Sequence, residues 1–348
     1  MRSYRLALIG FGNVGQGFAQ ILRDQGPELA KQFDLDLKIT AVSDPIKGSI
    51  YEPAGFDPAT LLDTVQAGRS LETLKATATG WDAKKTIAES NADAIVELSY
   101  TDLKTGEPAA SYIRQALERG LHAVTTNKGP IALHYPELSA IARRKGVQIG
   151  IEGTVMSGTP TMRLGAELLG AAGVSRVMGI VNGTTNYILT QMENGAPYAD
   201  ALAEAQAQGY AEADPTGDVE GFDAAGKVVI LANVLMSAAL TMGDVDRQGI
   251  TQLTPADIAA AQAEGQRWKL IASVEKTADG AVIAAVRPTR LPVTHPLASV
   301  GGPTNAVTFT TALLGDVTLI GPGAGRLPTG YAILCDLLAI ARSTPTGQ

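Results

Sequence analysis

The chain has 348 residues, of which 45% are hydrophobic and 18% are charged, and its formal net charge is −7. This length is large for one domain and suits two, with enough apolar residues for a sizeable core. A negative charge without a basic run argues against nucleic acid as a partner, and the single cysteine excludes intrachain disulfides and cysteine-rich metal sites.

The chain opens with a strand, a glycine-rich turn and a helix. Residues 4–9 are an apolar run that predicts a buried strand, and the turn that follows reads GFGNVG. In this context Gly10 permits a tight turn, Gly12 lets the backbone approach a pyrophosphate, and Gly15 lets the helix pack closely on the strand. The free N–H groups of the helix start favour phosphate. The predicted dinucleotide site comprises Gly10, Gly12, Asn13, Val14 and Gly15.

The early start of this strand also bears on location. It leaves no room for a signal peptide, and no apolar stretch is long enough to span a membrane. Together with the lone cysteine, this predicts a cytoplasmic protein without a membrane partner.

The second predicted strand, residues 37–42, ends at Ser43 and Asp44. An acidic residue at this point usually takes the ribose hydroxyls and favours NAD over NADP. Asp44 lies further from the glycines than is usual, because residues 24–36 lengthen the first helix and its loop. No arginine follows Asp44, although Lys47 is near, so we expect NAD to be preferred.

Two more strands of the first domain end in polar residues. Residues 94–98 lead to Ser99 and Thr101, and residues 122–126 lead to Lys128. Ligands bind at the carboxyl ends of parallel strands, so Lys128 is placed to face the cofactor and the reacting carbon; a surface lysine on a loop is the alternative. The other elements predicted before residue 150 are helices at 107–119 and 136–145 and a strand at 147–151.

A second set of elements follows residue 150. The segment from Asn182 to Asn186, NGTTN, joins a strand to a helix, and its small polar side chains suit recognition of a carboxylate or an amino acid. They also suit plain capping, with Thr185 or Asn186 as the N-cap. The remaining predicted elements are helices at 161–169, 187–193, 198–208 and 329–341 and strands at 174–181, 281–286, 306–310 and 315–320.

The segment from Gly209 to Lys227 is the most informative part of the chain. It carries five carboxylates within twelve residues and ends in a lone lysine. A helical pattern begins near Asp223, and the spacing of four places Asp223 and Lys227 on one face. Such a pair, with further carboxylates beside it, can bind an ammonium group and move a proton. The alternative is an exposed acidic loop with an ordinary ion pair.

The order of these motifs resembles the homoserine dehydrogenase family in its short form, without a C-terminal regulatory domain. The motifs are GFGNVG, TTNKGP, NGTTNYIL, GYAEADPTGDVEGFDAAGK and GPGAG, and the resemblance runs from Leu6 to about Ala341. It implies NAD(P)-dependent interconversion of L-homoserine and L-aspartate 4-semialdehyde in threonine and methionine biosynthesis. Feedback by threonine through a regulatory domain is not expected.

The resemblance also implies an α/β fold of two domains. Residues 1–150 would form a Rossmann-type dinucleotide-binding domain, on which the C-terminal segment 321–348 packs back. Residues 151–320 would form a mixed α+β domain for substrate binding and dimerisation, so a homodimer or larger homo-oligomer is expected.

Site residues carry over position by position. Lys227 matches the catalytic acid–base, and Lys128 matches a second lysine near the nicotinamide and substrate. Predicted substrate ligands are Glu212, Asp223, Asp218 and Thr184. Predicted cofactor contacts beyond the glycine turn and Asp44 are Ser99, Thr101, Lys128 and Gly325. In some members a sodium or potassium ion binds backbone oxygens that correspond to Glu152, Val155, Ser157 and Thr159.

Two departures from the family pattern leave alternatives open. The chain reads GTVMSGTP where many members have a glycine-rich ATVGGG-type turn, and Gly330-Tyr331 replaces small residues such as Ala-Ser. A related dehydrogenase that acts on a different small amino or hydroxy acid is therefore the nearest alternative. A non-catalytic NAD-binding regulator is the other, although it would need the glycine turn without the lysines.

Overall fold

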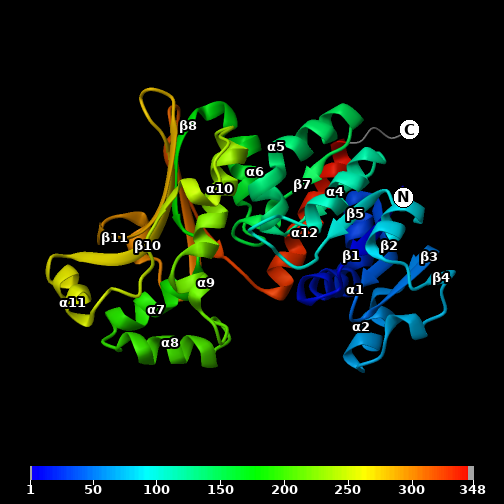
Figure 1. Ribbon diagram of the computed structural model, residues 1–348, viewed down its shortest axis with the longest axis horizontal. Helices are drawn as coiled ribbons and strands as arrows, with labels where there is room; N and C mark the ends of the chain where they lie inside the picture. Colours follow the sequence, from blue (N-terminus) through cyan, green and yellow to red (C-terminus); the bar gives the residue numbers. More distant parts are fainter. Residues whose placement is uncertain (1, 344–348) are drawn as a thin grey trace. The chain divides into compact units, whose positions relative to one another are not determined.

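The computed structural model describes residues 2–343, and the chain folds into two compact units. Unit 1 comprises Met1–Gly158 together with Gly325–Gln348, and unit 2 comprises Thr159–Ala324. Figure 1 traces the chain through both. Within the described residues, no helix has the length and apolar character that a membrane span requires.

Unit 1 is built on a seven-stranded sheet with the strand order β4-β3-β2-β1-β5-β6-β7. Strands β2, β1, β5, β6 and β7 run parallel, whereas β3 and β4 extend the sheet as antiparallel strands at one edge. The strands are β1 (Arg2–Ile9), β2 (Leu35–Asp44), β3 (Gly48–Phe56), β4 (Ala78–Thr79), β5 (Ala94–Glu97), β6 (His122–Thr125) and β7 (Ile149–Gly150). The helices are α1 (Asn13–Phe33), α2 (Pro58–Gln66), α3 (Ala83–Glu89), α4 (Ala109–Glu118), α5 (Lys128–Lys145) and α12 (Arg326–Ser343).

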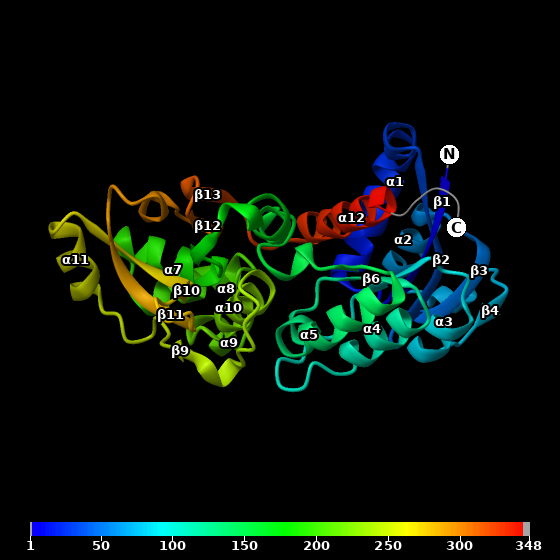
Figure 2. The same cartoon turned by 90° about the horizontal axis from the view of Figure 1, so that it is seen from above.

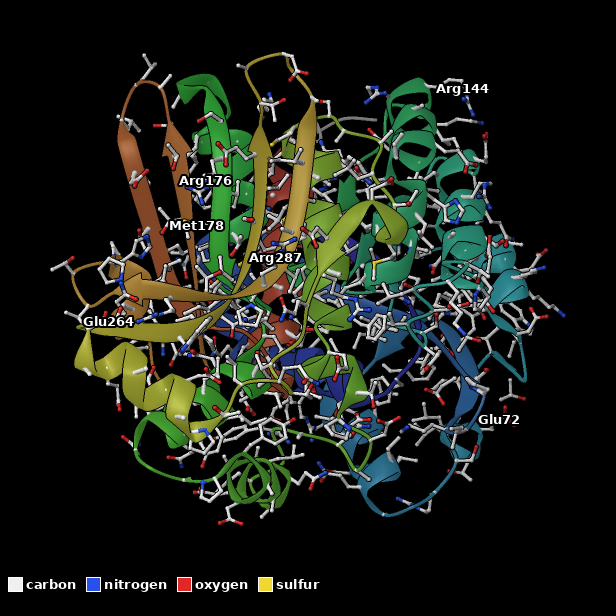
Figure 3. The ribbon with its side chains drawn as sticks, turned by 60° about the vertical axis from the view of Figure 1, so that its left-hand side comes forward. Glu72, Arg144, Arg176, Met178, Glu264 and Arg287 are labelled. Carbon is white, nitrogen blue, oxygen red and sulfur yellow. The ribbon has the colours of Figure 1, made fainter. Side chains whose placement is uncertain are left out.

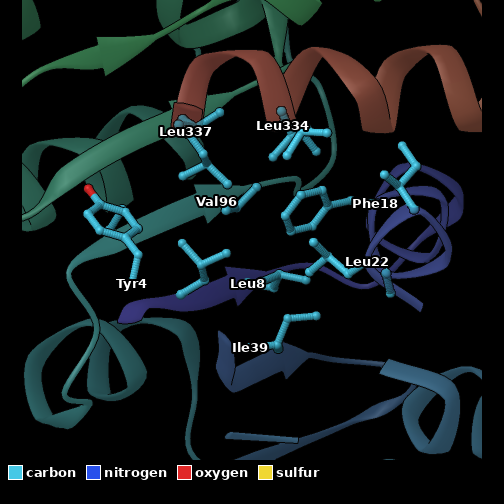
Figure 4. Close-up of a cluster of buried hydrophobic side chains, with 14 of the residues drawn as sticks. Tyr4, Leu8, Phe18, Leu22, Ile39, Val96, Leu334 and Leu337 are labelled. Carbon is cyan, nitrogen blue, oxygen red and sulfur yellow. The ribbon is translucent and has the colours of Figure 1, made fainter. Parts of the chain in front are cut away.

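The period of two along β1 divides the core of unit 1 between the two faces of its sheet. Leu6 and Leu8 belong to a cluster that includes side chains of α1 and α12, whereas Ala7 and Ile9 belong to a second cluster with α3, α4 and α5. Figure 4 shows the first cluster, where Phe18 of α1 and Leu334 of α12 face Leu8 and Val96. The last helix of the chain thus completes the core around the first strand.

Unit 2 is built on a six-stranded sheet with the order β13-β12-β8-β10-β11-β9, in which only the β11–β9 pair is parallel. Helices α7 and α10 pack against this sheet (Figure 2). Arg176 and Met178 lie on one face of β8, and Figure 3 shows them on the sheet with Arg287 of β11. The strands are β8 (Val174–Ile180), β9 (Val245–Arg247), β10 (Gln266–Lys276), β11 (Val282–Pro292), β12 (Thr304–Thr311) and β13 (Gly315–Pro322). The helices are α6 (Thr161–Arg163), α7 (Gly183–Glu193), α8 (Tyr198–Ala207), α9 (Thr216–Val219), α10 (Phe222–Leu235) and α11 (Pro255–Ala263).

The structure corrects several predicted elements. Helix α5 begins at Lys128 and contains Pro136, although a proline pattern had predicted the start at residue 136. The helix predicted at 161–169 is a single α-helical turn followed by a π-helical turn at Leu164–Leu168. Strand β3 was not predicted, because its glycines and Pro53 mask the strand pattern.

Candidate active site

The glycine turn of unit 1 connects β1 to α1. Gly10 has φ +102°, and a Cβ there would lie 2.6 Å from the carbonyl oxygen of Leu98. Both the backbone conformation and the lack of space therefore exclude a side chain at this position. A Cβ on Gly15 would lie 3.1 Å from the oxygen of Gly10, which shows how closely the helix packs on the turn. A Cβ on Gly12 would meet nothing within 4 Å, so this side of the helix start is open. The turn has the geometry that pyrophosphate binding requires.

Asp44 at the end of β2 holds this turn in place. Its Oδ2 accepts a hydrogen bond from the backbone N–H of Phe11 at 2.7 Å, and its Oδ1 accepts from Ile46 N at 2.9 Å and Lys47 N at 2.8 Å. Burial would raise the pKa of Asp44, but the hydrogen bonds from these three N–H groups outweigh it and lower the pKa. Asp44 therefore has a structural role that its position after a strand did not reveal.

The ends of β5 and β6 are joined by a buried carboxylate, Glu97. Ser99 donates to it from both its backbone N–H, at 2.8 Å, and its hydroxyl, and Thr125 donates from Oγ1 at 2.9 Å. Burial is the largest influence on this carboxyl and raises the pKa of Glu97, although these hydrogen bonds oppose it. Sequence reasoning missed this residue, and the signal for it was a single charge in an otherwise apolar strand.

Lys128 and Thr101 lie near this carboxyl edge of the unit 1 sheet. Lys128 is the first residue of α5, and the N-cap before it is Asn127, whose side chain accepts from Gly129 N at 3.1 Å. Thr101 lies in the loop after β5 and is partly buried. Gly325, with φ +129°, precedes α12 in the same unit.

In unit 2 a hydrogen-bonded network surrounds Lys227. Its ammonium donates to Asp223 Oδ2 at 2.7 Å and to the carbonyl of Val181 at 2.6 Å, and only 8% of the residue is exposed. Asp223 lies in the first turn of α10, one turn before Lys227, as their spacing predicts. The buried position distinguishes this pair from an ordinary surface ion pair.

Asn182 extends the network to a second carboxylate. Its Nδ2 donates to Asp218 Oδ1 at 2.6 Å and to Asp223 Oδ2 at 3.0 Å, so one amide bridges two acids. Its Oδ1 accepts from Thr185 N at 2.9 Å, which makes Asn182 the N-cap of α7 in place of the predicted Thr185 or Asn186. Burial, followed by the charge of Asp223, raises the pKa of Asp218, whereas the Asn182 hydrogen bond and Lys227 oppose the change.

The other predicted substrate ligands take different positions. Thr184 is buried, and its hydroxyl donates to the carbonyl of Tyr210 at 2.6 Å, which ties α7 to the start of the acidic segment. Glu212 is exposed in the loop between α8 and α9, where its main-chain carbonyl accepts from Gln206. The structure thus brings Asp218 and Asp223 to Lys227 and leaves the Glu212 side chain outside this network.

The segment predicted to bind a cation has an unusual backbone. Glu152 opens a short 3-10 turn, and its N–H donates to Asp336 Oδ2 at 2.9 Å. Met156 and Ser157 have φ values of +58° and +55°, a conformation that glycine adopts without strain. The glycine-rich turn of the family pattern would adopt this conformation without strain, whereas Met156 and Ser157 adopt it with side chains. Val155 is extended and buried in unit 1, whereas Thr159 belongs to unit 2.

Comparison with known proteins assigns both parts of the chain to one family. A family model described as homoserine dehydrogenase matches residues 160–338, and one described as the NAD binding domain of homoserine dehydrogenase matches residues 10–152. The NAD(+)-dependent homoserine dehydrogenase of Pseudomonas canavaninivorans is 45% identical over 348 residues, which cover 100% of this chain and 99% of that protein.

Solved structures agree with this assignment. The crystal structure of a putative homoserine dehydrogenase from Archaeoglobus fulgidus has a TM-score of 0.86 and 37% identity, and the match covers 97% of this chain and 99% of that one. A hyperthermophilic archaeal homoserine dehydrogenase in complex with NADPH has a TM-score of 0.83 and 29% identity, with 99% of each chain covered. The predicted family and fold class are confirmed: the chain belongs to the homoserine dehydrogenase family.

Proposed function

We propose that this protein is an NAD(P)-dependent homoserine dehydrogenase that interconverts L-homoserine and L-aspartate 4-semialdehyde. The observation that carries the proposal is the buried Lys227, hydrogen-bonded to Asp223 within a network of two carboxylates. The full-length similarity to an NAD(+)-dependent homoserine dehydrogenase supports the same activity.

Lys227 would act as the acid–base group. In the direction of oxidation, the C4–H bond of homoserine breaks and the hydroxyl proton must leave. A bound nicotinamide ring supplies the acceptor for the hydride. Lys227 Nζ, in its neutral form, takes the hydroxyl proton, and in the reverse direction it returns that proton to the aldehyde oxygen. The carbonyl of Val181 and the carboxylate of Asp223 keep the amine directed to one place.

Asp223 and Asp218 would bind the substrate's ammonium group. Both lie within hydrogen-bond distance of the Asn182 amide, so they form one acidic site rather than separate surface charges. For Lys128 we propose the orientation of the reacting oxygen, since it stands at the carboxyl edge of the sheet where such folds bind ligands.

The cofactor proposal favours NAD over NADP. A carboxylate at the end of β2 supports it, because the 2′-phosphate of NADP would meet a negative charge there. The NAD(+)-dependent relative supports the same preference, although the NADPH complex shows that a relative binds the phosphorylated cofactor. A homodimer and an alkali cation belong to the same proposal by family resemblance.

The experiment is initial-rate oxidation of L-homoserine with NAD and NADP in parallel, each in sodium, potassium and choline chloride. We expect turnover with a higher kcat/KM for NAD. Absence of turnover with both cofactors in every salt would contradict the proposed reaction, and a preference for NADP would contradict the role of Asp44. Light scattering of the same sample gives the mass of the oligomer, and a monomer would contradict the dimer.

A further inference from the structure

Glu97 stands out among the buried groups to which the proposed reaction assigns no role. It is the last residue of β5, lies between β1 and β6 in the middle of the parallel sheet, and has an exposed fraction of 0%. Burying a carboxyl group in the middle of a sheet costs free energy unless its oxygens accept hydrogen bonds. Its two oxygens accept from the Ser99 N–H, the Ser99 hydroxyl and the Thr125 hydroxyl.

These hydrogen bonds belong to a network that joins the loop after β5 to the start of α5. Thr125 Oγ1, which donates to Glu97, also accepts from Asn127 N at 3.0 Å. The Asn127 side chain donates to the carbonyl of Tyr100 at 3.1 Å and to that of Ser99 at 3.4 Å. The loop after β5 and the start of α5 are therefore fixed to each other through one carboxylate and one amide.

We propose that Glu97 is a positioning residue for cofactor binding: it holds the Ser99–Thr101 loop and the start of α5, with Lys128, in the arrangement that a nicotinamide dinucleotide requires. The inference rests on the proposed function, which places the cofactor at this carboxyl edge. Glu97 itself is too deeply buried to contact a ligand, so its effect passes directly through Ser99, and through Thr125 to Asn127.

A carboxylate suits this place because its partners are donors. The Ser99 N–H, the Ser99 hydroxyl and the Thr125 hydroxyl all donate to Glu97, so both of its oxygens are needed as acceptors, whereas glutamine would turn an NH₂ group toward one of these donors. If that group met Thr125, the threonine hydroxyl would have to accept from residue 97 as well as from Asn127, and its own proton would lose the acceptor that Glu97 provides. Glu97→Gln should therefore loosen the two loops without changing the volume of the core.

The test measures equilibrium binding of NADH, by fluorescence titration without substrate, together with the thermal unfolding midpoint. For Glu97→Gln, and for Thr125→Val, we expect the Kd for NADH to rise roughly tenfold, the change that corresponds to one buried polar group left without its hydrogen bond. Thr125→Val keeps the proposal testable if Glu97→Gln does not fold, because it removes a partner and leaves Glu97 in place.

The matched control is Val96→Ala. Val96 is the neighbouring residue of β5, is equally buried, and packs in the apolar cluster on one face of the sheet. The smaller side chain lowers stability, yet the Kd for NADH should stay within about twofold of the wild-type value, since no polar contact is lost. Equal weakening in Val96→Ala, or wild-type binding in Glu97→Gln and Thr125→Val, would overturn the positioning role.

The two proposals can fail separately. If the wild type binds NADH but does not oxidise homoserine, the proposed substrate is wrong, and the binding ratios still decide the role of Glu97. If the wild type binds no nicotinamide dinucleotide at all, the proposed function fails and the inference about Glu97 fails with it.

Discussion

At the scale of single residues, Lys227 is buried, and its ammonium group has only a few hydrogen-bond partners. Its ammonium has one carboxylate and one carbonyl within hydrogen-bond distance. An amine that must exchange a proton with a substrate has to be directed to one place and kept away from bulk water. Lys227 in α10, a helix whose other buried residues are mostly apolar, meets both conditions that the proposed acid–base role sets.

Replacement of Lys227 by alanine tests its role directly. We expect kcat to fall by roughly 10²–10⁴-fold, the range that general acid–base catalysis contributes, while the Kd for NADH stays near the wild-type value. The measurement is steady-state kinetics with a parallel NADH titration. Lys276→Ala, which removes an exposed lysine from β10 of the same unit, is the control and should retain full activity. Normal turnover of Lys227→Ala would refute the assignment.

A second prediction concerns Asn182 and the pH dependence of activity. The ionised form of Asp218 would hold the substrate ammonium, so kcat/KM should fall as the pH drops through the pKa of Asp218. Burial already raises that pKa, and the Asn182 hydrogen bond opposes the change. Asn182→Ala removes the opposing bond, so the acid limb of the pH profile should move to higher pH and KM for homoserine should rise.

The control for this shift is Asn233→Ala. Asn233 is buried in α10, and its side chain binds the backbone of Leu240, so its loss should lower stability without moving the acid limb. Equal pH profiles for the wild type and Asn182→Ala would show that Asn182 does not tune the acidic site.

The sequence could predict one half of this network and not the other. Asp223 and Lys227 are four residues apart on a helix, and helical geometry alone places them side by side. Asn182 is 41 residues from Asp223, and only the fold of unit 2, which brings the N-cap of α7 to the first turn of α10, places the two together. Its neighbours in NGTTN are all plausible caps by composition, so the residue that bridges the acids could not be chosen from spacing.

At the scale of elements, Asp44 links the end of β2 to the glycine turn. It accepts three backbone N–H bonds, and its folded pKa is lowered. A carboxyl with a lowered folded pKa stabilises the protein at pH values above its unfolded pKa. That contribution is lost as the pH falls through the folded pKa.

Asp44→Asn should therefore cost about 2 kcal/mol in the free energy of unfolding at neutral pH, since hydrogen bonds to a charged acceptor are replaced by weaker ones. The difference from the wild type should shrink as acid protonates Asp44. The measurement is urea unfolding at several pH values, with Asp63→Asn on α2 as a control, whose effect should be small at every pH. A difference that did not change with pH would contradict the electrostatic explanation.

The sequence predicts a helix or strand best where its apolar residues follow a single clear pattern, either the helical period or the strand period. The apolar run of β1 and the glycines after it predicted the strand, turn and helix correctly. Helix α5 was predicted too short, because Pro136 suggests a helix start, whereas the Asn127 cap lies nine residues earlier. A proline inside a helix is tolerated where the surrounding fold compensates, and this cannot be read from local sequence.

At the scale of the whole molecule, the chain leaves unit 1, forms unit 2 and returns to unit 1 with its last helix. The close approach of α12 to α1 requires glycine on both helices: a Cβ on Gly17 would lie 2.2 Å from Arg326 O, and one on Gly330 would lie 2.6 Å from Phe18 N. The resemblance predicts the return, but only packing explains Gly330, which departs from the family pattern.

This return predicts that α12 is required for cofactor binding although it follows unit 2 in sequence. Ile333, Leu334 and Leu337 are almost fully buried in the core around β1. At ~1.5–3 kcal/mol for each buried side chain, their loss is comparable to the total stability of many domains, about 5–15 kcal/mol. A chain that ends after Ala324 should therefore lose NADH binding, as measured by fluorescence titration, while unit 2 keeps a cooperative thermal transition in circular dichroism.

The control for this prediction is Leu337→Ala, which removes one side chain at a cost of about 3 kcal/mol. This variant should unfold at a lower temperature and still bind NADH. Wild-type NADH binding by the shortened chain would mean that β1 and α1 fold without α12, and the core around β1 would then have to be complete without those three side chains.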